Sequence, residues 1–184
     1  MDNGSRSYDR YLNGDDSALS EIVHEYKDGL TLYLNTFTNN LYDAEEIMEE
    51  TFYKLAYKKP KFKGKSSFRT WLYSIGRNLA IDYLRKRSRH SAESLEDHYD
   101  LKGNEDIELN YIKEEQKKMI HKAIHDLRSE YRQVICLIYL EGFDTSETAR
   151  IMHKTNRQIT NLLYQAKKVL KKELEKGGVS YEGL

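Results

Sequence analysis

Apolar residues in the first half of the chain recur with the period of an α-helix. Between residues 19 and 37 they fall on one face of a 3.6-residue repeat, and Asn39 and Asn40 interrupt that repeat. Asp43 follows, with Glu46 three residues later, which is the spacing of a capping box at a helix start. The pattern therefore predicts two successive helices, the second beginning near Asp43.

A basic loop and a third helix follow. Pro60 ends the second helix, and residues 60–67 form a short loop rich in lysine. The next helix is expected from Phe68 to Arg87. Its packing stripe comprises Phe68, Leu72, Ile75, Leu79 and Tyr83. Residues 88–110 then have few apolar anchors and many polar side chains, which indicates a linker between two domains.

The C-terminal part of the chain predicts a helix–turn–helix. Helical periodicity returns at residue 112, and Gly142 is placed to end a helix over residues 131–140. Two more helices follow, separated by a tight turn at residues 153–154, and each begins with capping-box spacing. The capping pairs are Asp144 with Glu147 and Thr155 with Gln158.

These elements predict an all-α fold of two small helical domains joined by a flexible linker. The expected boundaries are residues 10–88 for the first domain, 89–111 for the acidic and polar linker, and 112–176 for the domain with the helix–turn–helix. A single proline in 184 residues agrees with a mostly helical chain. No apolar run approaches the roughly 20 residues that span a bilayer, so we expect a cytoplasmic protein without membrane insertion.

Charge divides the chain more sharply than hydropathy does. The formal net charge is zero, yet residues 1–53 carry −9, residues 54–89 carry +11, residues 90–149 carry −7 and residues 150–184 carry +5. Two basic segments separated by an acidic one suggest two contacts with a polyanion, and nucleic acid is the expected partner.

The first basic segment interleaves lysine and arginine with aromatic residues. Single-stranded DNA needs this combination, because cations neutralise its backbone and flat side chains stack on its bases. The alternative is that the aromatic residues belong to the core and the lysines are merely solvated. Phe68 and Tyr83 lie on the packing stripe and favour the core. Trp71 and Tyr73 lie off the main stripe, and for them both interpretations stay open.

The second basic segment contains the helix–turn–helix, which would place its second helix in a major groove of duplex DNA. Arg157, Gln158 and Asn161 could pair with base edges, and the lysines of that helix could contact phosphates. The alternative is an ordinary helical hairpin.

The sequence gives only weak signals for metal binding or catalysis. His121 and His125 have a zinc-compatible spacing but lack a third ligand, so no metal or other cofactor is expected. Cys136 lies in an apolar run and is expected in the core. The acidic cluster at residues 43–50 is more typical of a helix start with a partner-binding face than of catalysis. No catalytic signature is recognisable, and we expect a protein that is not an enzyme.

Several of these motifs resemble one family. In the first domain they are residues 43–52 (DAEEIMEETF), 62–64 (FKG), 68–78 (FRTWLYSIGRN) and 82–85 (DYLR), and in the second, residues 139–149 (YLEGFDTSETA) and 166–170 (AKKVL). The chain resembles the extracytoplasmic-function (ECF, group 4) sigma factors of the sigma-70 family over about residues 10–88 and 112–175. The two halves occur in the family's order and at its distance.

The resemblance implies an alternative sigma factor that binds core RNA polymerase and directs promoter-specific transcription initiation. The helix at 43–59 would hold the polymerase clamp, the loop at 60–67 and the next helix would capture and melt the minus-10 strand, and the last helix would read minus-35 duplex. Residues expected at the polymerase contact are Asp43, Glu46, Ile47, Glu50 and Phe52. Residues expected at the minus-10 strand are Phe62, Lys63, Lys65, Ser66, Arg69, Trp71, Tyr73, Arg77 and Asn78. Residues expected at the minus-35 duplex are Lys154, Arg157, Gln158, Thr160, Asn161, Tyr164, Lys167 and Lys168.

The expected partners are core RNA polymerase, promoter DNA in duplex and single-stranded form, and an anti-sigma factor. The alternative function is a stand-alone helix–turn–helix regulator that acts without polymerase. The chain also departs from the family pattern. Leu127-Arg128 stands where Leu-Pro is common, and residues 157–162 (RQITNL) lack the usual lysine and arginine of the recognition helix. Duplex affinity is therefore expected to depend more on Lys167 and Lys168.

Overall fold

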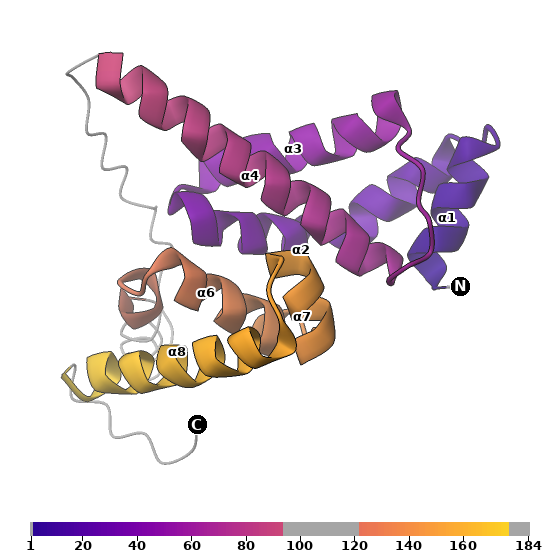
Figure 1. Cartoon of the computed structure of the whole chain (residues 1–184). Coiled ribbons are helices and arrows are strands. Elements are labelled where there is room, and N and C mark those ends of the chain that lie inside the picture. Colours follow the sequence, from indigo (N-terminus) through magenta and orange to yellow (C-terminus); the bar gives the residue numbers. More distant parts are fainter. Residues whose placement is uncertain (1, 94–121, 177–184) are drawn as a thin grey trace, which may run out of the picture.

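The computed structural model of the chain describes residues 2–93 and 122–176, and every regular element in them is helical (Figure 1). The all-α class with two helical units is thus confirmed. The elements are α1 (Asn3–Leu12), α2 (Ser17–Thr38), α3 (Leu41–Lys58), α4 (Phe68–Glu93), α6 (Ser129–Ile135), the π-helix η1 (Cys136–Leu140), α7 (Thr145–Met152) and α8 (Asn156–Lys176). Most of the linker expected at residues 89–111 lies outside the described residues.

The N-terminal unit is a bundle of α1 to α4 with α2 at its centre. Helix α2 packs against α1, α3 and α4, and α4 also lies across α3 (Figure 1). Ile22, Leu30 and Leu34 of α2 are fully buried. They lie at the helical spacing that the sequence pattern showed, so the period of the apolar residues here does place one face of the helix in the core.

Two local details differ from the sequence prediction. Helix α3 is capped by Asn40, whose side-chain oxygen accepts from the backbone N–H of Asp43, so Asp43 lies inside the first turn and is not the cap. Asn39 takes a left-handed conformation at the end of α2 and lets the chain reverse direction at once. The helix therefore starts two residues earlier than expected.

Helix α1 was not anticipated, and Asp2 ties it to α4. One carboxylate oxygen of Asp2 accepts from the backbone N–H of Ser5 at 2.8 Å, and the other accepts from the N–H of Phe68 at 2.7 Å. A single side chain thus caps the N-termini of two helices. Further along α1, the Tyr8 hydroxyl donates to the carbonyl of Pro60 at 2.8 Å, which fixes the end of α3 and the start of the basic loop.

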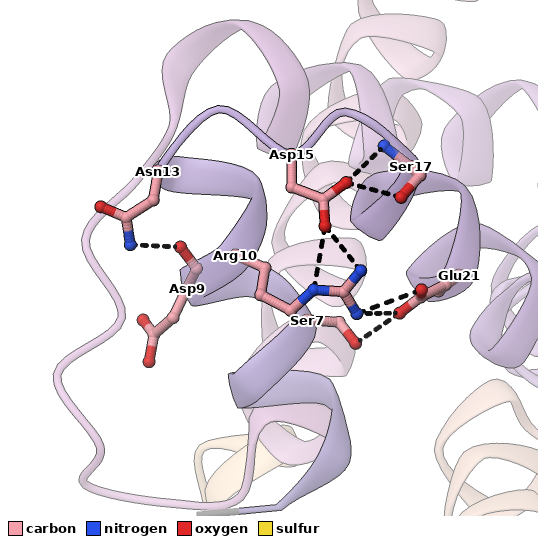
Figure 2. Close-up of polar contacts among 7 residues, drawn as sticks. All are labelled: Ser7, Asp9, Arg10, Asn13, Asp15, Ser17 and Glu21. Atoms are coloured by element: carbon pink, nitrogen blue, oxygen red, sulfur yellow. Dashed lines mark hydrogen bonds and ion pairs between the residues drawn. The ribbon is translucent and has the colours of Figure 1, made fainter.

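An exposed polar cluster fixes the turn between α1 and α2 (Figure 2). The Arg10 guanidinium donates to the carboxylates of Asp15 and Glu21, and Asp15 also accepts from the backbone N–H and hydroxyl of Ser17. These hydrogen bonds lower the pKa of Asp15, with Ser17 the largest cause. Because the groups face solvent, the cluster orients the turn more than it stabilises the fold.

The C-terminal helices pack directly on the N-terminal unit. Arg132 of α6 is buried, and its Nε and Nη2 donate to the carbonyl of Thr36 at the end of α2, at 3.1 and 3.0 Å. Its Nη1 donates to the carbonyls of His125 and Leu127. Burial lowers the pKa of this guanidinium. A buried cation here compensates the negative end of the α2 dipole.

The π-helix η1 ends the apolar run that contains Cys136. The Cys136 thiol is buried, as expected, and burial raises its pKa to about 12. Gly142 follows η1 with a φ of +68°, the left-handed geometry expected of a glycine just past a helix end. Among the described helices, none has both the length and the apolarity needed to cross a membrane.

We expect Asp2→Ala to lower the free energy of unfolding by about 1–3 kcal/mol, because caps of two helices are lost together. Urea denaturation followed by circular dichroism measures it. Asn3→Ala, an exposed neighbour without a cap, is the control. A change below about 0.5 kcal/mol, the usual range for surface substitutions, would show that Asp2 does not hold the two helices.

Candidate nucleic-acid interface

The basic loop between α3 and α4 carries exposed lysines and one half-buried aromatic side chain that anchors it. Lys61, Lys63 and Lys65 are exposed, whereas Phe62 is half-buried against the core. Gly64 has a φ of +66°, which an L-residue adopts only with strain, and it allows the loop to turn toward α4. The loop therefore presents its charge outward from a fixed backbone.

Phe62 inserts into an aromatic cluster that includes Trp71. The Trp71 ring centroid lies 5.2 Å from Phe62, 5.5 Å from Phe68 and 5.6 Å from Tyr8. Phe68 is fully buried, which confirms its assignment to the core, while Trp71 keeps part of its ring at the surface. Trp71 is thus both a packing residue and a candidate surface for stacking, and the two interpretations of it are not exclusive.

Tyr73 is not on the open surface that the minus-10 prediction requires. It is 1% exposed, its ring stacks on Tyr33 at 5.6 Å, and its hydroxyl donates to the Glu141 carboxylate of the C-terminal unit at 2.5 Å. Burial and the Glu141 carboxylate raise its pKa. The helical period placed Tyr73 off the main stripe of α4, and a second unit covers that side, so of the two interpretations left open for Tyr73 its burial supports the core.

The remaining minus-10 candidates lie on several sides of α4 and the loop. Asn78 is exposed and Ser66 half-buried, and the Arg69 guanidinium pairs with Glu141 at 2.5 Å. Arg77 is half-buried, and its Nε is enclosed without a hydrogen-bond partner among residues 2–93 and 122–176. The structure thus brings Phe62 and Trp71 together, and it separates Arg69 and Tyr73 from them, at the boundary with the C-terminal unit.

The expected polymerase contact divides into an exposed and a buried part. Glu46 and Glu50 are exposed and line a cleft between α3 and α4. Ile47 and Phe52 are buried in the core, and the Asp43 carboxylate is buried in an ion pair with Arg87. Only Glu46 and Glu50 therefore have side chains free to meet a partner. The other three support the helix that carries them, which corrects the sequence prediction.

The helix–turn–helix has the two capping boxes that the sequence predicts. Asp144 accepts from the N–H of Glu147 at 2.7 Å and Glu147 accepts from the N–H of Asp144 at 3.2 Å. Thr155 and Gln158 exchange the same pair of bonds at the start of α8. His153 between the helices is left-handed, with a φ of 53°, and this makes the turn tight.

Helix α8 presents most of its candidate residues to solvent. Those that are exposed are Arg157, Gln158, Thr160, Asn161, Tyr164 and Lys168. Two lysines are half-buried: Lys154 pairs with Glu130 at 3.0 Å, and the Lys167 ammonium lies 5.1 Å from the ring centre of Tyr139. Ile159 and Ala166 are buried on the opposite face. One face of α8 is thus a polar and basic surface of the size that a major groove accepts.

Sequence reasoning missed four residues at the boundary between the units. They are Ser67, Thr70, Glu141 and Glu147, which join α4 to the C-terminal unit by side-chain hydrogen bonds. Glu147 was recognised as a capping residue, but its second role depends on a contact 80 residues away. His121 of the weak zinc pair lies outside the described residues. In the part that is described, no three His, Cys, Asp or Glu side chains gather as metal ligands would.

Comparison with known families matches both parts of the chain. The model of Sigma-70 region 2 matches residues 22–90, and that of Sigma-70, region 4 matches residues 117–170. Together these cover most of the chain, in the order in which the two basic surfaces occur. Helix α1 lies outside both matches.

Individual relatives agree with the family models. The chain is 26% identical over 176 residues to RNA polymerase sigma-H factor of Pseudomonas aeruginosa, covering 91% of each chain, and 26% identical over 177 residues to the ECF sigma factor SigW of Bacillus subtilis, covering 88% and 91%. Among solved structures, CnrH in complex with the cytosolic domain of CnrY has a TM-score of 0.68 at 18% identity over 95% and 99% of the chains. RpoE in complex with the anti-sigma factor NepR from Bartonella quintana has 0.67 at 21% over 85% and 96%. These structures are similar in fold.

Trp71 is the only tryptophan of the chain, so its fluorescence reports on this surface alone. We expect a single-stranded oligonucleotide to quench its emission, because a base stacks on the exposed part of the ring. The corresponding duplex should quench it less. Lys168→Ala on α8 is the control and should leave the quenching unchanged. Constant emission while a labelled oligonucleotide saturates the protein would remove Trp71 from the interface.

Proposed function

The chain belongs to the extracytoplasmic-function group of the sigma-70 family, and we propose that three surfaces of it divide the work of promoter opening. It is an alternative sigma factor that binds core RNA polymerase and directs promoter-specific transcription initiation. Sigma factors are generally initiation factors without enzymatic activity, and we propose no catalytic role for this chain. A protein with this task works where chromosomal DNA is transcribed, so we place it in the cytoplasm.

The observation that carries the proposal is the difference in character between the two basic surfaces. The loop at residues 60–67 with Trp71 combines exposed lysines with an accessible aromatic ring, which suits an unpaired strand. Helix α8 presents amide and guanidinium groups with few exposed aromatic rings, which suits base edges in a duplex. We assign the first to the minus-10 strand and the second to the minus-35 duplex.

The acidic edge of the α3–α4 cleft is the proposed polymerase contact. Glu46 and Glu50 project from it, and the ion pair of Asp43 with Arg87 fixes α3 against α4 behind them. Exposed carboxylates at a docking surface steer the partner and set its register. A stand-alone DNA regulator has no use for such a surface, and the family relationship does not favour that alternative.

We further propose that an anti-sigma factor regulates the chain. RpoE of Bartonella quintana was solved with the anti-sigma factor NepR, and CnrH with the cytosolic domain of CnrY. The chain shares the fold of both. The DNA contacts assigned above do not depend on which residues such an inhibitor binds.

Reversing both charges, in Glu46→Lys with Glu50→Lys, should weaken binding to core RNA polymerase at least about tenfold, or roughly 1.4 kcal/mol. Run-off transcription and a pull-down with purified core enzyme measure it. Asp28→Lys in α2 with Glu45→Lys in α3 makes the same charge change at exposed positions beside the α2–α3 groove and should bind nearly as the unchanged protein does. Equal loss in both pairs would mean that general charge, and not this edge, attracts the polymerase.

Two substitutions on α8 should affect duplex binding in different ways. Asn161→Ala should cost about 1–3 kcal/mol on the preferred minus-35 sequence and little elsewhere, because a base contact is lost. Lys168→Ala should weaken binding to all sequences and lower the salt slope by about 1, because a phosphate contact is lost. Selection from a random promoter pool with the polymerase complex supplies the sequences. The assignment of α8 fails if neither change alters the selected sequences or the salt dependence.

A further inference from the structure

A carboxylate of the C-terminal unit is held inside the N-terminal unit. Glu141, just after η1, has a side chain only 9% exposed, and its Oε2 accepts from Arg69 Nη2 and from the Tyr73 hydroxyl, both at 2.5 Å. A Cβ added at Gly29 of α2 would lie 2.5 Å from the same oxygen. We call the three residues that receive this carboxylate, Gly29, Arg69 and Tyr73, the Arg69 site.

A second carboxylate lies one turn nearer the start of α4. Glu147 Oε1 accepts from the hydroxyls of Ser67 and Thr70, each at 3.1 Å, while its other oxygen completes the capping box of α7. Beside it, Arg150 of α7 donates to the carbonyl of Lys65 in the basic loop at 2.8 Å. The start of α7 therefore lies along the beginning of α4 and the loop that precedes it.

The donors that hold these carboxylates form an anion-binding set. They are one guanidinium and three hydroxyls on a single face, and the guanidinium is fixed in place because it lies 4.2 Å from the ring centre of Phe143 and 5.5 Å from that of Tyr73. Burial tends to lower the pKa of Arg69, but Tyr73 and Glu141 more than offset this and raise it. Such groups bind phosphate oxygens as well as carboxylate oxygens.

The position of these donors in the chain indicates which other anion would compete with the two carboxylates. Arg69, Ser67 and Thr70 lie on the helix and loop assigned above to the opened DNA strand, in the segment of net charge +11. Along that strand the anions are backbone phosphates. The carboxylates Glu141 and Glu147 stand where a strand crossing the start of α4 would bring its phosphates.

Building on the proposed function, we propose that the Arg69 site binds a phosphate of the opened strand, and that Ser67 and Thr70 beside it bind the next one. While the two units are closed on each other, Glu141 occupies the Arg69 site and Glu147 occupies the two hydroxyls, as internal mimics of the phosphates. A bound DNA strand and the two carboxylates of the closed chain then compete for the same guanidinium and hydroxyl donors. A partner that separates α7 from α4 uncovers the site. If nine of ten free molecules are closed, the apparent affinity for a strand falls about tenfold.

Two variants test the competition by different means. Glu141→Gln removes the charge of the mimic. Gly29→Ala adds a Cβ 2.5 Å from the carboxylate oxygen and 2.6 Å from the Tyr73 hydroxyl, so it pushes the carboxylate away from the site without any change of net charge and also requires the Tyr73 hydroxyl to shift. Alanine also favours the helix more than glycine does, so α2 should fold normally. We expect both variants to bind a fluorescent single-stranded oligonucleotide of mixed sequence about 3- to 10-fold more tightly than the unchanged chain, as measured by anisotropy. Small-angle scattering should show a larger radius of gyration.

The control is Glu175→Gln, the same change at an exposed position of α8, which should leave both measurements unchanged. Adding Arg69→Ala to Gly29→Ala should abolish the gain in affinity. A gain in Glu175→Gln equal to that in Glu141→Gln would overturn the proposal, since it would reflect charge alone. A gain that survives Arg69→Ala, or a chain that opens without binding more tightly, would also overturn it.

Run-off transcription with core polymerase separates this inference from the proposed function. If the unchanged chain supports promoter-dependent transcription while the variants bind the oligonucleotide no better, only the competition at the Arg69 site is wrong. If no variant and not even the unchanged chain supports transcription, the proposed function itself fails.

Discussion

Burial of α2 on more than one side is the constraint on which the rest of the structure depends. Its apolar face, with Ile22, Leu30 and Leu34, packs inside the N-terminal bundle. Its last turn offers the Thr36 carbonyl to Arg132, and Gly29 in its middle lies against Glu141. One helix therefore sets the positions of both units, and a shift of α2 would change the bundle and the boundary together.

The two arginines at the boundary solve different physical problems. Arg132 donates to the backbone carbonyls of Thr36, His125 and Leu127, and only the first of these also accepts a hydrogen bond from the Ser129 hydroxyl among the described contacts, so loss of Arg132 would remove donors from buried acceptors. Arg69 pairs with a carboxylate on a side chain, and water or another anion can replace that partner when the units part. The first interaction is structural and the second is exchangeable. The proposed competition needs this difference, because only the Arg69 contact has to be exchanged for a phosphate.

The parts of the fold that sequence reasoning predicted are those that depend on near neighbours in the chain. Both capping boxes and the left-handed Gly142 needed contacts within a few residues, and they were correct. Helix α1 was missed because its polar sequence gains its buried face from α2, α4 and the carbonyls of Ala56 and Pro60, far along the chain. Asp43 was mistaken for a cap because Asn40 competes for the same role. The position of Tyr73 stayed open because the residue that its hydroxyl contacts comes 68 residues later.

The separation of Arg69 from Glu141 by 72 residues also matters while the protein is being made. A ribosome synthesises α1 to α4, with their basic loop, well before it reaches either carboxylate, and N-terminal units fold as they emerge. During that interval the loop is uncovered beside ribosomal RNA, itself a dense polyanion. The donors of α4 that Glu141 and Glu147 engage in the folded chain therefore stay open to RNA phosphates until both carboxylates have been synthesised.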